Sequence, residues 1–175
     1  MMRNFSYFLL DITMVIATIW ILKKFLGTLF EPKKPEWMTL AAWILFAVYQ
    51  IFNEYHKGNA SIWNMVLTIL LALLISAVGY EKTGRLKLLY LVLFYAVWCL
   101  TEMMVYFGLN QMGESQESFT MLGSVISKIL MMILVHVLSV CWKKRSISAI
   151  PPLYYYTLMF VPLGSICIAV NAFYM

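Results

Sequence analysis

The feature that most constrains this chain is a series of long apolar runs separated by short charged clusters. The run from Ile62 to Tyr80, for example, contains no charged residue. Of the 175 residues, 63% are apolar or aromatic and 12% are charged, against about 25% charged in typical soluble proteins. Too little polar surface remains to coat a fold in water. The composition therefore excludes a soluble globule, a disordered chain and a nucleic-acid-binding protein, and predicts a protein that lies mostly in lipid.

Six runs have about the length that a membrane-spanning helix needs, roughly 17 to 25 residues, the second being the shortest. They cover residues 5–22, 37–52, 62–80, 86–107, 121–142 and 153–174. Backbone polar groups in hydrocarbon must be satisfied within a helix or a closed barrel, and these runs lack the alternating polarity of barrel strands. The sequence therefore predicts an all-α polytopic integral membrane protein, a six-transmembrane-helix bundle that forms one transmembrane domain over residues 1–175.

The first run could be mistaken for a signal peptide, because Arg3 precedes it. It contains Asp11, however, and is followed by Lys23 and Lys24 rather than by a small-x-small cleavage site. We therefore expect a retained first helix.

Positively charged residues between the runs predict the orientation of the bundle. They gather in the first, third and fifth loops: Lys23, Lys24, Lys33, Lys34, Lys82, Arg85, Lys87, Lys143, Lys144 and Arg145. By the positive-inside rule these loops are cytoplasmic, so both chain ends are expected to be extracytoplasmic. The net charge of +5 then reflects orientation against an anionic leaflet, and no nucleic-acid partner is expected.

Three ionisable residues lie inside the runs at similar depth in the outer leaflet: Asp11, Glu102 and Lys128. A charge within a span is costly, so each is a candidate functional residue. Our hypothesis is a polar cluster in which Lys128 pairs with Glu102 or Asp11 and faces a cavity open to the outside. The alternative is a structural ion pair that fixes helix register, or side chains that snorkel to the interface.

The remaining candidates are single residues. His136 is a secondary polar candidate that could hydrogen-bond a neighbouring helix, and Pro162 is expected to kink the sixth helix. Cys99, Cys141 and Cys167 are expected to be buried apolar groups, and His136 and Cys141 are five residues apart, so a continuous helix turns them about 140° from each other. No catalytic residue, metal site or cofactor is predicted, because no nucleotide-binding, metal-ligand or hydrolase motif is present.

Several short motifs together resemble a known family. They are Arg85-Leu86-Lys87-Leu88-Leu89-Tyr90, Glu102, the run from Gly123 to Leu130 (GSVISKIL), Lys143-Lys144-Arg145, Ile150-Pro151 and the run from Val161 to Ile166 (VPLGSI). In their order, they resemble the N-terminal transmembrane sensor region of GHKL-type sensor histidine kinases of Firmicutes, the group that includes the accessory-gene-regulator peptide receptors.

The resemblance implies a signal-sensing domain in a bacterial cell membrane. It implies an extracellular peptide or small-molecule signal, a homodimer, and a cytoplasmic kinase reached through a seventh helix. No phosphoacceptor or ATP-binding segment follows Met175 in this sequence, so no enzymatic activity is assigned to the chain. Two alternatives stay open: a substrate-binding subunit of a small-molecule uptake system, and a membrane peptide-processing protease.

Overall fold

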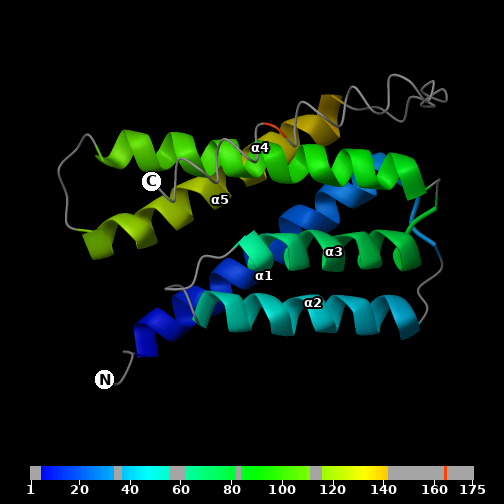
Figure 1. The fold of residues 1–175 in the computed structure, drawn as a ribbon, viewed down its shortest axis with the longest axis horizontal. Coiled ribbons are helices and arrows are strands. Elements are labelled where there is room, and N and C mark those ends of the chain that lie inside the picture. Colours follow the sequence, from blue (N-terminus) through cyan, green and yellow to red (C-terminus); the bar gives the residue numbers. More distant parts are fainter. Residues whose placement is uncertain are drawn as a thin grey trace. The chain divides into compact units, whose positions relative to one another are not determined.

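The computed structural model describes residues 5–33, 37–55, 62–81, 84–110 and 116–141, together with Gly164. Within these ranges the regular structure is helical, apart from one isolated β-bridge. The five helices are α1 (Phe5–Leu29), α2 (Trp37–Tyr55), α3 (Ile62–Gly79), α4 (Gly84–Asn110) and α5 (Gln116–Cys141) (Figure 1). The all-α class is therefore confirmed for the described residues.

The helices fall into two compact units, unit 1 (Met1–Gly84) and unit 2 (Arg85–Met175). Unit 1 contains α1, α2 and α3, and unit 2 contains α4 and α5. A single transmembrane domain over residues 1–175 stays a prediction.

Two of the described helices are long and apolar enough to cross a membrane: α4 over Gly84–Leu109 and α5 over Leu122–Cys141. The apolar parts of α2 and α3, Trp37–Asn53 and Trp63–Gly79, are shorter. All five helices cover runs that the sequence analysis identified. The sixth predicted helix, 153–174, lies outside the described residues except for Gly164, which is helical.

The end of the first helix was predicted wrongly. Its apolar run stops at Leu22, but α1 continues past Lys23 and Lys24 to Leu29. Both lysines are exposed on the helix surface, whereas Phe25, Leu26 and Leu29 are buried. Lysine is a good helix former, so a charged pair on the exposed side need not end a helix whose other side still buries apolar side chains.

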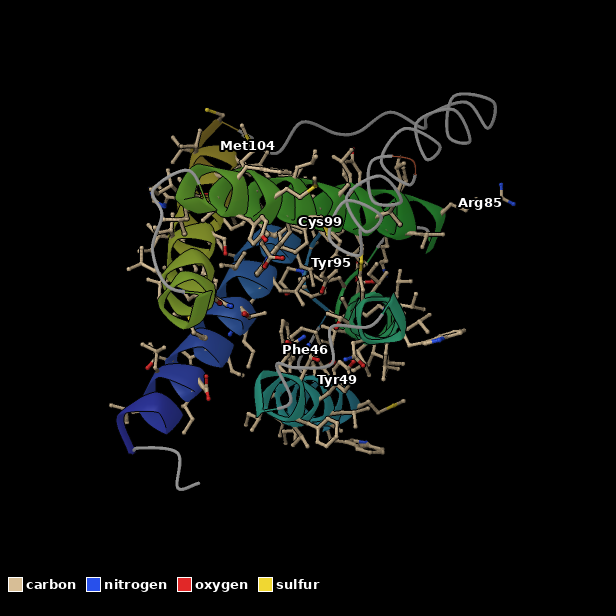
Figure 2. The ribbon with its side chains drawn as sticks, turned by 60° about the vertical axis from the view of Figure 1, so that its left-hand side comes forward. Phe46, Tyr49, Arg85, Tyr95, Cys99 and Met104 are labelled. Carbon is tan, nitrogen blue, oxygen red and sulfur yellow. The ribbon has the colours of Figure 1, made fainter. Side chains whose placement is uncertain are left out.

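Unit 1 is built around an antiparallel hairpin of α2 and α3, with α1 packed against α2 (Figure 1). Its least exposed apolar side chains come from all three helices: Ile21, Leu22, Leu26, Phe46, Ala72 and Ile75. At one end of the hairpin, a Cβ atom added to Gly79 would lie 2.9 Å from Thr39 Cγ2. Toward the other end, Tyr49 reaches from α2 toward α3 (Figure 2), and its hydroxyl donates to the Asn64 carbonyl at 3.0 Å. These two contacts fix the register of the hairpin.

The close approach at Gly79 gives a stability prediction. We expect Gly79→Ala to destabilise the protein by about 1–3 kcal/mol, because the new methyl group would overlap Thr39 Cγ2. Thr39→Ser removes that Cγ2 atom and leaves Oγ1, which lies 3.8 Å away. The double variant should therefore recover most of the loss, as measured by chemical unfolding in detergent micelles.

Gly27→Ala in α1 is the matched control, because nothing lies within 4 Å of the Cβ position of Gly27. Alanine there should be neutral or stabilise by up to about 1 kcal/mol through helix propensity. Equal effects of Gly79→Ala and Gly27→Ala, or no recovery with Thr39→Ser, would show that the approach of Thr39 does not limit residue 79.

A small backbone bridge joins the segment after α1 to the segment after α3. Pro32 and Tyr80 form an antiparallel β-bridge; the Lys33 amide donates to the Gly79 carbonyl and the Glu81 amide to the Glu31 carbonyl, both at 2.9 Å. No local sequence pattern predicts this bridge, which holds two of the predicted cytoplasmic loops at the same end of unit 1.

Candidate functional site

Glu102 and Lys128, two of the three residues of the predicted polar cluster, lie on neighbouring helices of unit 2. The Thr101 hydroxyl on α4 contacts Met131 Sδ on α5 at 3.7 Å. A Cβ atom added to Gly123 on α5 would lie 3.5 Å from Leu109 Cδ1 and 3.8 Å from Val105 Cγ1 on α4. The two contacts define an antiparallel register.

In this register, Thr101 is level with Met131, and the Val105–Leu109 turn is level with Gly123. Because residues advance in opposite directions along the two helices, Glu102 falls level with about the Lys128–Leu130 stretch of α5. The structure thus brings Glu102 and Lys128 to the same depth in unit 2. Their direct pairing stays a prediction.

Glu102 is held by an aromatic side chain of its own helix. Its Oε1 atom accepts a hydrogen bond from Trp98 Nε1 at 2.8 Å, within the ordinary range for an N–H···O bond. Trp98 is buried and stacks on Tyr95, with ring centroids 6.5 Å apart and planes inclined by 22°. Tyr95, Cys99 and Met104 follow one another along α4 (Figure 2). Glu102 itself is exposed, and the indole N–H holds one oxygen of its carboxylate.

Lys128 is buried in α5, with only 6% of its surface exposed. Its Nζ atom donates to Ser124 Oγ, one helical turn earlier, at 3.0 Å. Burying an ammonium group requires compensating partners, and the Ser124 hydroxyl is one of them. The burial of Lys128 in a helix of membrane-spanning length makes it the strongest candidate of the predicted cluster.

Asp11, the third predicted residue, lies in α1 and therefore in unit 1. It is 9% exposed, so it too is buried in an apolar helix. Its membership of a cluster with Glu102 and Lys128 stays a prediction.

The secondary candidates are less informative. His136 is exposed on α5, and its backbone carbonyl accepts a hydrogen bond from the Ser139 hydroxyl at 2.7 Å. Cys141 is exposed rather than buried, and the unbroken α5 turns it about 140° from His136. Across the described residues, no three His, Cys, Asp or Glu side chains are arranged to hold a metal ion. Pro162 lies outside the described residues.

Two contacts of the site were missed although the sequence contains a signal for them. Trp98 and Glu102, like Ser124 and Lys128, are four residues apart, which places each pair on one helix face. An indole or hydroxyl one turn from a charged residue in an apolar run is therefore expected to hydrogen-bond the charged group.

Comparison with known proteins does not identify a family for the chain. No family model, no curated protein and no solved structure matches the chain.

Proposed function

We propose that the chain is a membrane-embedded signal-sensing domain of a bacterial cell, with six transmembrane helices and both ends of residues 1–175 outside the cytoplasm. The observation that carries the proposal is the pair of long apolar helices α4 and α5, which hold Glu102 and the buried Lys128 at the same depth. Ionisable groups within such helices are expensive and commonly belong to functional sites.

The proposed mechanism is a change in how α4 packs on α5. The contacts between α4 and α5 include Gly123 apposed to Val105 and Leu109, and the Thr101 hydroxyl on a methionine sulfur. Such contacts are weak and methionine adapts easily to new neighbours. A peptide or small-molecule signal at the outer end that binds one packing better than the other would shift the balance between them.

A pair of chimeras tests both the sensing function and the orientation. In the first, residues 1–175 are joined to the last transmembrane helix and kinase of an accessory-gene-regulator-type receptor; in the second, the kinase follows Met175 directly. We expect the first chimera to change its autophosphorylation when peptide fractions of Firmicutes culture medium are added. The second should be inactive, because its kinase would lie outside the cell, away from ATP.

The control is the first chimera carrying Glu102→Gln and Lys128→Met. It should insert normally but no longer respond. Activity of the second chimera would contradict the proposed orientation. Accumulation of a vitamin or other small solute by cells that express the chain, with no kinase response in either chimera, would favour the uptake-subunit alternative.

A further inference from the structure

The α2–α3 hairpin of unit 1 exposes large apolar side chains around an interior that is mainly apolar and includes two polar side chains. Gln50 of α2 and Ser76 of α3 are buried. The large apolar side chains exposed along the two helices include Leu40, Ile44, Leu45, Val48, Leu67 and Leu70. A helix of a water-soluble domain exposes mainly polar and charged side chains, so this surface fits hydrocarbon rather than water.

The exposed apolar surface is bounded by two tryptophans. Trp37 begins the apolar part of α2, Trp63 begins that of α3, and each is 79% exposed. Because the helices are antiparallel, with Thr39 beside Gly79 and Tyr49 bonded to Asn64, the two tryptophans lie at opposite ends of the hairpin. Tryptophan collects at both interfaces of a bilayer.

The distance between these ends is short for a bilayer. Trp37–Asn53 and Trp63–Gly79 are each about 25 Å long at about 1.5 Å per residue, whereas a typical hydrocarbon core is about 30 Å thick. No charged residue occurs in either stretch, and charges follow closely at Glu54 and Glu81. The charged residues Glu54 and Glu81 thus limit the apolar surface after the ends of both stretches.

The neighbouring helix α1 agrees with a thin apolar layer. Lys23 and Lys24 are exposed although α1 continues to Leu29, about 8 Å farther along its axis. A lysine stem can span such a distance to bring its ammonium group to water. Charges exposed this far before the end of α1 indicate that the polar boundary of the membrane is reached before the helix ends.

We propose that the α2–α3 hairpin contacts lipid acyl chains over a hydrophobic belt, bounded by Trp37 and Trp63, that is only about 25 Å tall. The belt fits a bilayer thinner than average, so the hairpin thins the surrounding membrane or gathers lipids with short acyl chains. The inference rests on the membrane location in the proposed function, but it needs no signal and no kinase.

Spin labels test the belt in dioleoylphosphatidylcholine vesicles. Single cysteines replace Trp37, Leu45, Trp63 or Leu70 in a full chain whose three native cysteines are changed to alanine, and each nitroxide is probed with oxygen and a nickel chelate. Oxygen is enriched in hydrocarbon and the chelate in water. The ratio of oxygen to nickel collisions should be several-fold higher at the two middle positions, Leu45 and Leu70, than at the two tryptophan positions.

Two results would overturn the proposal. Equal nickel access at all four positions would mean that the surface faces water, and a label at Trp37 or Trp63 as deep as those in the middle would mean that the belt is longer. If a middle label prevents folding, as judged by circular dichroism, two other exposed positions replace it: Ile44→Cys, about 1.5 Å from Leu45 along α2, and Leu67→Cys, about 4.5 Å from Leu70 along α3. Since no signal is added, the labels report the belt independently of whether the kinase chimera responds.

Discussion

Replacing Lys128 with Met should destabilise the protein by about 1–3 kcal/mol. Methionine keeps most of the volume of the side chain but removes the ammonium group that donates to Ser124 Oγ at 3.0 Å. Any carboxylate that pairs with Lys128 would then be left in an apolar setting without its counter-charge, and such losses are large when the group is buried. Steric trapping or chemical unfolding in bicelles measures the change.

A set of double variants identifies the partner of Lys128. Glu102→Gln and Asp11→Asn are each made alone and with Lys128→Met. If Glu102 is the partner, Glu102→Gln combined with Lys128→Met should cost at least about 1 kcal/mol less than the sum of the single changes, because no unpaired charge remains. The same reasoning applies to Asp11→Asn.

Ser124→Ala is the control for the local hydrogen bond. It removes the serine hydroxyl and leaves the charge of Lys128, so it should cost only about 0.5–1.5 kcal/mol. Additive effects for both double variants, within about 0.5 kcal/mol, would rule out pairing with either carboxylate. In that case the cost of Lys128→Met would come from its other contacts, the hydrogen bond to Ser124 among them.

The positions of the helices could be predicted because lipid imposes a simple rule on composition. Each of the five described helices covers an apolar run of the sequence. The end of α1 was missed because Lys23 and Lys24 look like a loop when charge alone is considered. The buried side chains of Phe25, Leu26 and Leu29 were the better signal, since they continue the buried side of the helix beyond the lysines.

The site was predictable only in part, because the sequence encodes contacts within one helix but not the packing between helices. That Glu102 and Lys128 matter follows from their charge in apolar runs, and their partners Trp98 and Ser124 follow from helical spacing. The Pro32–Tyr80 bridge joins segments almost fifty residues apart, and no local pattern encodes such a contact. The same holds for the level placement of Glu102 and Lys128, which depends on the register of α4 on α5.

Leu70→Lys should be among the most costly single changes in the chain if α3 lies in lipid. Leu70 is exposed near the middle of the apolar stretch Trp63–Gly79. In water, an exposed leucine can become lysine with a change of less than about 0.5 kcal/mol. At the centre of a membrane helix, lysine costs about 2.5–3.5 kcal/mol on insertion scales. The fraction of α3 that inserts during translation into microsomes measures this cost.

Leu74→Lys is the matched comparison, because Leu74 is exposed on the same helix one turn later. It lies five residues before the end of α3 at Gly79, just as the exposed Lys24 lies five residues before the end of α1 at Leu29. A lysine at residue 74 can therefore snorkel as Lys24 does, and its cost should be at least about 1 kcal/mol smaller than at residue 70. Equal costs at the two positions would mean that the cost of inserting lysine does not depend on its depth. No cost at residue 70 would mean that this face of α3 lies in water, and that its exposed apolar side chains need another explanation.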